Sequence, residues 1–246
     1  MPNDHGTNIA NDMMNESLHR VDFSSSADFA KHCRRLVLED GAIIVEGLES
    51  GDLQEFIRAF GPIVKQHDGN ETFEVSPSEE LGSIYHSRTT NAVPAHTDGH
   101  DILVPPNFFF LLCVRPSREA DGLTEVSSVS SLLNNLSEKE IDVLTTHQFC
   151  FGTKPSSTVM KSGPVYAPIY DAQKDIFRYS YNYLSNQSTD GSATALIEKI
   201  NRHHQQHKQS VLLGSKDLLI CENYHVLHSR TGFSGADRKL VRAWTN

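Results

Sequence analysis

The residues best suited to chemistry in this sequence begin with His96 and Asp98, which are separated by one residue. On an extended chain, side chains two residues apart point to the same face, so this imidazole and this carboxylate can meet at one point. Two histidines and one carboxylate form the facial triad that binds Fe(II) and leaves its other coordination positions open. The pair supplies two of these three ligands. Because a His-x-Asp pair also occurs in ordinary turns, the metal hypothesis needs a second histidine from elsewhere in the chain.

A second motif lies near the C-terminus, where an apolar run from Leu218 to Cys221 leads to Asn223. Such a run is typical of a buried strand. His228 and Arg230 follow in what we expect to be a second extended segment. An early His-x-Asp motif combined with a late His-x-Arg motif is a more specific pattern than either motif alone.

Together these motifs resemble those of the taurine dioxygenase (TauD/TfdA) and clavaminate synthase-like family of Fe(II)/2-oxoglutarate oxygenases. That family combines His-x-Asp or His-x-Glu with a later threonine, then Asp-Asn, His-x-Arg and finally Asp-Arg-x-Leu-x-Arg. In this chain the threonine ends the segment Asp121–Thr124, and the closing motif is Asp237–Arg242. The resemblance extends from about Phe60 to Trp244.

The resemblance implies a role for each matched residue. The iron ligands are expected to be His96, Asp98 and His228, and the cosubstrate 2-oxoglutarate is expected to bind the Thr124 hydroxyl and Arg238. Fe(II) with one aspartate and the 2-oxoglutarate dianion carries an excess negative charge, which a bidentate guanidinium cancels while it orients the carboxylate. The implied reaction uses O2, converts 2-oxoglutarate to succinate and CO2, and oxidises a small substrate, most simply by hydroxylation.

Two further residues are expected to contact the substrate. Arg242 follows Arg238 by four residues, so on an extended strand both side chains face the same side. The matching arginine of the family holds the substrate's anionic group, which implies an anionic, amino-acid-derived metabolite. Tyr181 ends an expected strand, 176–181, whose family counterpart borders the substrate pocket. The alternative for Arg242 is an ion pair with a neighbouring acid near the sheet edge.

Two other histidines compete for the metal. His100 would face the same site if the strand continued past Asp98, and His225 lies three residues before His228. We expect His100 to have left the strand after Gly99, and His225 to be a partly buried histidine outside the ligand set.

A third group of histidines, His203, His204 and His207, has the spacing of one helix face but is surrounded by Gln and Lys. We predict a solvated face there. Glu222 stands where the family usually has Asp before its asparagine, which is a departure next to the matched positions.

The elements around these motifs predict a mainly β fold with inserted helices. Short apolar runs between Gly, Pro, Asn and Ser clusters indicate strands. We expect them at 42–45, 107–114, 124–129, 148–151, 165–169, 176–181, 218–221 and 240–244. Such a series of short strands is typical of a double-stranded β-helix, the jelly roll of cupin-like proteins.

Four helices are expected to decorate this core. They cover 27–39, capped by Ser24–Ser26, then 52–60, a segment after Ser137, and 192–209. Ser137 and Glu140 form a capping-box signature. We expect residues 1–20 to be a flexible tail and residues 21–246 to form a single domain.

Composition limits the partners. Lys and Arg number 22 against 31 Asp and Glu, giving a formal charge of −9, which argues against a nucleic-acid partner. The longest apolar run, Phe108–Val114, is too short to cross a bilayer, so no membrane association is expected. The four cysteines form no CxxC pair, which favours reduced thiols and a cytoplasmic location. The expected partner is a small-molecule substrate, and the oligomeric state is left open.

Two other functions fit the same ligand residues. A cupin-like hydrolase or isomerase would bind Zn²⁺ with His96, Asp98 and His228 and activate water at the open position. Thr124 and Arg238 argue against it, because such an enzyme needs no dicarboxylate clamp. A non-catalytic jelly-roll binding protein is the second alternative, and the complete ligand set argues against it.

Overall fold

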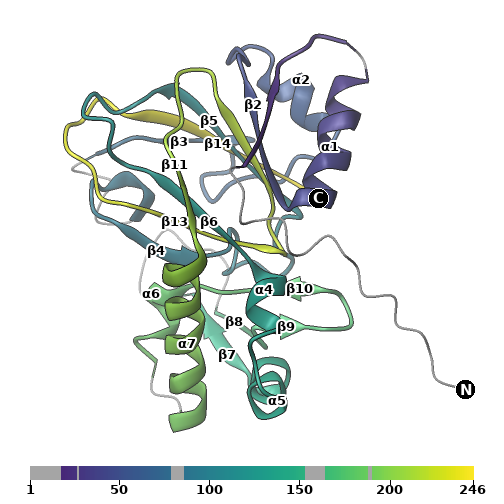
Figure 1. Ribbon diagram of the computed structural model, residues 1–246, viewed down its shortest axis with the longest axis vertical. Helices are drawn as coiled ribbons and strands as arrows, with labels where there is room; N and C mark the ends of the chain where they lie inside the picture. Colours follow the sequence, from purple (N-terminus) through teal and green to yellow (C-terminus); the bar gives the residue numbers. More distant parts are fainter. Residues whose placement is uncertain (1–17, 27, 79–85, 153–163, 188–189) are drawn as a thin grey trace, which may run out of the picture.

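The core of the protein is a sandwich of two sheets (Figure 1). The computed structural model describes residues 18–26, 28–78, 86–152, 164–187 and 190–246. The larger sheet has the strand order β1 (His19–Asp22), β2 (Ala42–Glu46), β12 (Leu218–Glu222), β5 (Phe108–Arg115), β14 (Lys239–Thr245) and β3 (Thr72–Val75). The smaller sheet has the order β11 (Gln209–Val211), β6 (Thr124–Ser128), β13 (Val226–Arg230) and β4 (Val93–His96). The described pairs in these sheets are antiparallel except β1 with β2.

Helices cover the outer faces of both sheets (Figure 1). On the larger sheet these are α1 (Phe29–Asp40) and α2 (Leu53–Arg58). On the side of the smaller sheet they are α4 (Val129–Leu133), α6 (Tyr181–Leu184) and α7 (Gly191–His207), and α5 (Glu138–Thr146) packs against α7. Below the smaller sheet lie two short ribbons, β7 (Phe149–Phe151) with β8 (Val165–Ala167) and β9 (Tyr170–Asp171) with β10 (Ile176–Phe177). The predicted jelly roll with helical decorations is confirmed.

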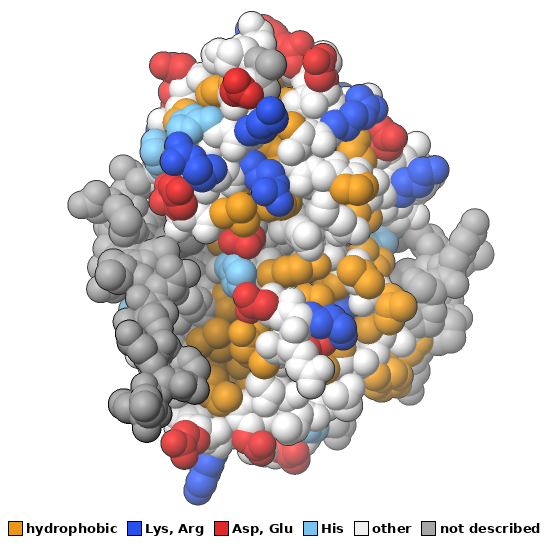
Figure 2. All heavy atoms as spheres, turned by 90° about the vertical axis from the view of Figure 1, so that its right-hand side faces the viewer, with side chains coloured by type: hydrophobic (Ala, Val, Ile, Leu, Met, Phe, Trp, Pro, Cys, Tyr) orange, Lys and Arg blue, Asp and Glu red, His pale blue; other side chains and the backbone are white. Residues whose placement is uncertain are grey.

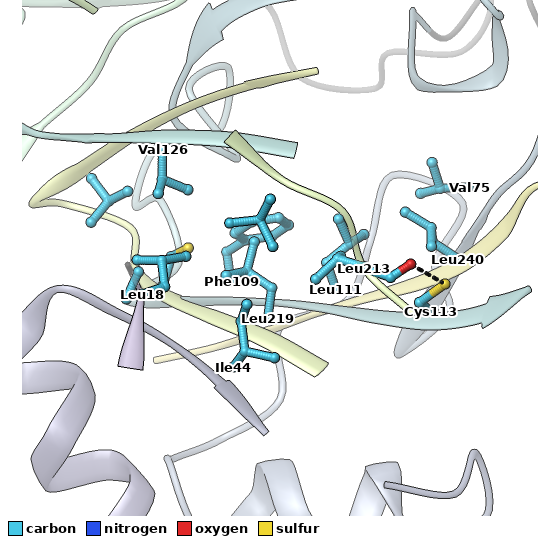
Figure 3. Packing of buried hydrophobic residues seen from close by; sticks show 14 of the residues in the cluster. Leu18, Ile44, Val75, Phe109, Leu111, Cys113, Val126, Leu213, Leu219 and Leu240 are labelled. Carbon is cyan, nitrogen blue, oxygen red and sulfur yellow. Dashed lines mark hydrogen bonds between the residues drawn. The ribbon is translucent and has the colours of Figure 1, made fainter. Parts of the chain in front are cut away.

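The longest apolar run of the sequence lies in β5, and in it apolar residues do not alternate with polar ones. Phe109 and Leu111 point into the space between the two sheets, where they pack with Val126 and Leu219 (Figure 3). The alternate residues, including Phe110, pack on the other face beneath α1 and α2. Because the strand is buried on both faces, both sets of side chains are apolar. Through Phe109 and Leu111, the strand lines the cavity between the sheets.

The capping box predicted for α5 is present. The Glu140 N–H donates to Ser137 Oγ at 3.4 Å, and the Ser137 N–H donates to Glu140 Oε2 at 2.7 Å. Lys199 of α7 also donates to Glu140 at 2.7 Å. The Lys199 ammonium and these bonds lower the pKa of Glu140 to about 2. The cap thus marks the start of α5 and ties this helix to α7.

Two expectations at the N-terminal end are wrong. The tail does not reach residue 20, because His19 starts β1, whose four residues pair in parallel with β2. The serines before α1 do not cap it, because its N-cap is Asp28, and no side-chain capping bond forms there. The first outcome depends on the partner strand β2, which lies about 20 residues further along the chain and which the local pattern around His19 does not reveal.

The strand expected at 176–181 is also wrong beyond its start. β10 ends at Phe177, and the chain then crosses the end of β4, where the Thr97 N–H donates to Tyr179 O at 2.9 Å. Ser180 forms an isolated bridge with His96, and Tyr181 begins α6. The residues after Phe177 are therefore positioned by their hydrogen bonds to the end of β4.

Basic and acidic side chains are mixed on the surface near α1 and α2, at the top of the face shown in Figure 2. Within the described ranges, no helix combines the length and apolar character needed to cross a membrane.

Candidate metal centre and cosubstrate cavity

Two histidines meet where β4 pairs with β13. His96 and His228 lie opposite each other in the register, and their ring centroids are 4.1 Å apart. The Phe109 ring stacks on His228 with centroids 4.5 Å apart and planes 13° apart. His96 Nδ1 lies 2.9 Å from Pro94 O, so an Nδ1–H donates there and the Nε2 lone pair is free for a metal.

Asp98 is held just beyond the end of β4. Its N–H donates to Asn223 Oδ1 at 2.8 Å, and Asn223 Nδ2 donates to the carbonyl oxygens of Asp98 and Pro106, each at 2.9 Å. Gly99 then turns the chain with a φ of +64°, and a Cβ there would lie 2.6 Å from Pro106 Cδ. Only glycine fits this turn without strain. The turn ends the strand, as expected, before His100.

The structure brings His96, Asp98 and His228 together. Each offers one ligand atom, and these atoms lie within 4.8 Å of one another. Asp98 Oδ1 is 3.8 Å from His96 Nε2 and 3.7 Å from His228 Nε2. Within the part of the chain that the structure describes, this is the one cluster of three or more His, Cys, Asp or Glu able to hold a metal. It has the composition of a facial triad.

The protonation states of the site suit a metal. Burial, together with the nearby His228, lowers the pKa of His96 well below its usual value. Burial opposes ionisation of Asp98, but Arg242 and the two histidines outweigh it, and the pKa of this carboxyl is lowered. The carboxylate is therefore ionised and His96 neutral at neutral pH, as metal binding requires. Two imidazoles and one carboxylate fit Fe(II).

The triad lines a cavity between the sheets together with Thr124 and two buried arginines, Arg230 and Arg238. Arg238 Nη2 donates to Gly122 O at 3.1 Å. Arg238 Nη1 is buried and has no hydrogen-bond partner among the described residues. A buried guanidinium with an unused N–H beside a cavity is suited to an incoming carboxylate. Burial lowers the pKa of Arg238 from its very high usual value.

Arg230 has a different task from Arg238. Its guanidinium donates to Thr89 O at 2.7 Å, to Ser87 O at 3.5 Å and to Asn91 O. These bonds tie the segment before β4 to β13. The arginine of the His-x-Arg motif therefore donates hydrogen bonds to backbone carbonyls. The sequence did not indicate this role.

Arg242 on β14 lines the same cavity as Arg238. Its Nε donates to Gln66 Oε1 at 3.0 Å, and its Nη1 lies 3.4 Å from Asp98 Oδ1. The guanidinium carbon lies 4.5 Å from the centroid of the Trp244 ring and 5.1 Å from that of Phe73. The acid beside Arg242 is thus a member of the triad and not an acid at the sheet edge. Gln66 was not recognised in the sequence, because it lies in no motif.

The structure places Tyr181 away from this cavity. Its hydroxyl donates to Glu198 of α7 at 3.0 and 3.2 Å, and it is not among the residues that line the cavity. The side chain of Tyr181 instead fixes α6 against α7. Its expected place in a core strand was wrong, as described above.

The two competing histidines are also outside the metal cluster. The His100 ring packs against Tyr183 with centroids 4.8 Å apart. His225 lies between Glu222 and Asp175, with nitrogen–oxygen distances of 3.0 Å to each. Glu222, where the family usually has Asp, thus pairs with this histidine.

The histidines of α7 do not form the predicted solvated face. His203 and His204 are buried, and His204 lies between the outward-facing serines of β6 and β13. Ser229 Oγ donates to Glu125 at 2.6 Å and accepts from His204 Nε2 at 2.8 Å. His204 Nδ1 then accepts from Ser127 Oγ at 2.7 Å. The prediction failed because the polar partners of this helix face belong to strands distant in sequence.

We expect this network to make stability depend on pH. Burial lowers the pKa of His204 to about 4, whereas the pKa of a histidine in the unfolded chain is ~6.5. Between these values the unfolded chain binds more protons, so the free energy of unfolding falls as the pH falls, and this loss stops below about pH 4. Urea unfolding at about pH 7 and pH 5 should show His204→Gln less stable at pH 7 but with a smaller further loss at pH 5. The same pH dependence in both proteins would contradict this role.

A comparison with known families identifies the family of the chain. The model of the family described as taurine catabolism dioxygenase TauD, TfdA family, matches residues 5–244. The chain belongs to this family. The resemblance expected from the sequence is confirmed, and with it the enzyme class, an Fe(II)/2-oxoglutarate-dependent dioxygenase that uses O2. A zinc hydrolase or a non-catalytic jelly roll is not favoured.

Solved structures with the same fold include two oxygenases of this kind. One is asparagine oxygenase in complex with Fe(II), 2S,3S-3-hydroxyasparagine and succinate, with a TM-score of 0.74 and 17% identity over 92% of this chain and 93% of that chain. Another is the non-heme iron oxygenase OrfP in complex with Fe and alpha-ketoglutaric acid, with a TM-score of 0.71 and 18% identity over 90% of this chain and 80% of that chain. These similarities confirm the fold of the TauD family member.

Proposed function

We propose that this dioxygenase hydroxylates a small amino acid, or a metabolite derived from one, that carries a carboxylate. The observation that carries the proposal is the position of Arg242, which lines the cavity with its Nη1 3.4 Å from Oδ1 of Asp98. An anion bound there lies next to the reacting centre. Similar structures hold 2S,3S-3-hydroxyasparagine in asparagine oxygenase and (3S)-hydroxy-L-Arg in another OrfP complex, and both molecules are hydroxylated amino acids.

His96, Asp98 and His228 are proposed to hold Fe(II), which with 2-oxoglutarate and O2 supplies the oxidant for the substrate C–H bond and yields succinate and CO2. Arg238 and Thr124 are proposed to hold the distal carboxylate of 2-oxoglutarate. The free Nη1 of Arg238 and the Thr124 hydroxyl on the cavity wall supply the donors. The protein's main contribution is to fix these groups relative to one another.

The direct test is succinate formation. The protein is incubated with Fe(II), 2-oxoglutarate and air, with and without each member of a panel of L-amino acids and their N-acyl and decarboxylated derivatives. We expect a carboxylate-bearing substrate to raise succinate formation and to gain one oxygen atom by mass spectrometry. Replacement of Fe(II) by Zn²⁺ should abolish both succinate formation and the gain of oxygen by the substrate. A turnover that needs Zn²⁺ and produces no succinate would contradict the proposal.

Arg242→Ala should separate substrate binding from cosubstrate binding. Loss of a charge-assisted bond that leaves a carboxylate unpaired costs about 2–5 kcal/mol, so the substrate KM should rise by roughly 30-fold or more. Measured at saturating Fe(II), the affinity for 2-oxoglutarate should change much less than the substrate KM, because Arg238 is intact. Lys239→Ala, which removes a half-exposed cation from the same strand, is the matched control. An unchanged substrate KM in Arg242→Ala, or a true substrate without an anionic group, would exclude this role.

We further propose a cytoplasmic location and a role in secondary metabolism. Free thiols at Cys33, Cys113, Cys150 and Cys221 support a reducing compartment. The net charge of −9 supports a small-molecule partner over nucleic acid. Fractionation of the native cells, followed by detection of the protein, tests the location.

A further inference from the structure

The two oxygens of Asp98 have different surroundings. Oδ2 accepts a hydrogen bond from Trp244 Nε1 at 2.7 Å. Oδ1 is the oxygen that lies 3.8 Å from His96 Nε2 and 3.7 Å from His228 Nε2. Asp98 and Trp244 are 3% and 1% exposed, so bulk water does not compete for this bond. The site therefore distinguishes one oxygen from the other.

The fold fixes the direction of the indole N–H. Trp244 lies on β14 between β5 and β3, in register with Phe109 of β5. The His67 ring meets it edge-on, with centroids 5.5 Å apart and planes at 90°. The Arg242 guanidinium covers its ring at 4.5 Å. A large, rigid ring held on several sides has one orientation, and so has its only donor.

We propose that Trp244 is a positioning residue that makes Asp98 a one-oxygen ligand of the metal. This inference rests on the proposed metal site. The hydrogen bond commits Oδ2 to the indole and presents Oδ1 to the point shared with the two histidine nitrogens. A carboxylate that bound through both oxygens would occupy an additional coordination position. Two histidines and one carboxylate that each bind through a single atom leave the other positions of Fe(II) open for 2-oxoglutarate and O2.

Arg242 does not supply the same constraint. Its Nη1 lies at the longer distance of 3.4 Å and approaches Oδ1, whereas its Nε is engaged by Gln66. The guanidinium thus contributes charge, which favours the ionised carboxylate, but it does not select Oδ1 as the free oxygen. Oδ1 is left free for the metal because the neutral indole N–H donates to Oδ2.

The chain contains one tryptophan, so every tryptophan signal belongs to Trp244. In ¹⁵N-labelled metal-free protein the indole N–H should give one resonance, and this resonance should shift when Zn²⁺ is added as a diamagnetic probe. Trp244→Phe should weaken metal binding by about 10- to 100-fold, the usual effect of removing a partner of a metal ligand. At saturating Fe(II) without oxygen, the variant should also bind 2-oxoglutarate more weakly, because a two-oxygen carboxylate competes for its position.

A second variant keeps the packing of the ring. Biosynthetic replacement of the tryptophan by benzothienylalanine puts sulfur in place of the N–H in a ring of nearly the same shape. We expect the melting temperature of this protein to remain close to that of the wild type, with both affinities reduced as in Trp244→Phe. If the wild type binds no metal, the proposed function fails. If the wild type binds metal and the benzothienyl protein binds metal and 2-oxoglutarate equally well, the role of Trp244 is overturned.

Discussion

His228→Ala is expected to abolish Fe(II) binding and turnover. The imidazole is buried, and its Nε2 is 3.7 Å from Asp98 Oδ1, so its loss removes one of three donors and leaves a gap between the sheets. No other histidine is placed to replace it in the described part of the metal site. The loss of affinity should exceed the roughly 10- to 100-fold effect of changes outside the ligand set. His96→Ala should behave in the same way.

The matched controls are the two histidines nearest to the motifs. His100→Ala removes a ring that packs on Tyr183, and His225→Ala removes a ring between Glu222 and Asp175. Both variants should keep most of their metal affinity and a measurable part of the activity. Anaerobic titration of the metal-free proteins with Fe(II), and with Co(II) as an optical probe, measures the affinities. The ligand assignment would be wrong if His100→Ala lost the metal and His228→Ala retained it.

The grouping of His96, Asp98 and His228 could be predicted because each residue belongs to a short motif that is visible in the sequence. His96 and Asp98 are two residues apart, and His228 sits in a short motif with Arg230. What holds Asp98 could not be predicted. Its partners Asn223 and Trp244 are 125 and 146 residues away in the sequence, so only the completed sandwich brings them together. Gln66, which is 176 residues from its partner Arg242, was missed for the same reason.

In the fold, too, features set by neighbouring residues could be predicted, and features set by residues distant in sequence could not. The apolar run of β5 predicts a buried strand by composition alone, and the α5 capping box predicts a helix start because both partners are local. β1, β3 and β11 are short edge strands of three or four residues, and their own sequences do not show which strand they pair with. The buried face of α7 was misread because His204 is hydrogen-bonded by serines of the sheet beneath it.

Arg238→Ala is expected to raise the 2-oxoglutarate requirement steeply. The guanidinium is 4% exposed, donates to Gly122 O through Nη2 and keeps a buried Nη1 free of partners among the described residues. Removing it takes away a charge-assisted bond and leaves the distal carboxylate unpaired in a poorly solvated cavity. The expected cost is about 2–5 kcal/mol of cosubstrate binding. Thr124→Ala should cost less, because it removes one neutral donor.

The measurement is an anaerobic titration of the Fe(II)-loaded protein with 2-oxoglutarate, followed through the metal-to-ligand absorption band. Arg118→Ala is the control, since Arg118 is an exposed arginine paired with Asp237, next to Arg238. Its 2-oxoglutarate affinity should equal that of the wild type. Arg238→Lys should fall between wild type and Arg238→Ala, because an ammonium keeps the charge but lacks the planar pair of donors. Equal 2-oxoglutarate affinity in the wild type and Arg238→Ala would refute the assignment, and the cosubstrate carboxylate would then have to bind elsewhere in the cavity.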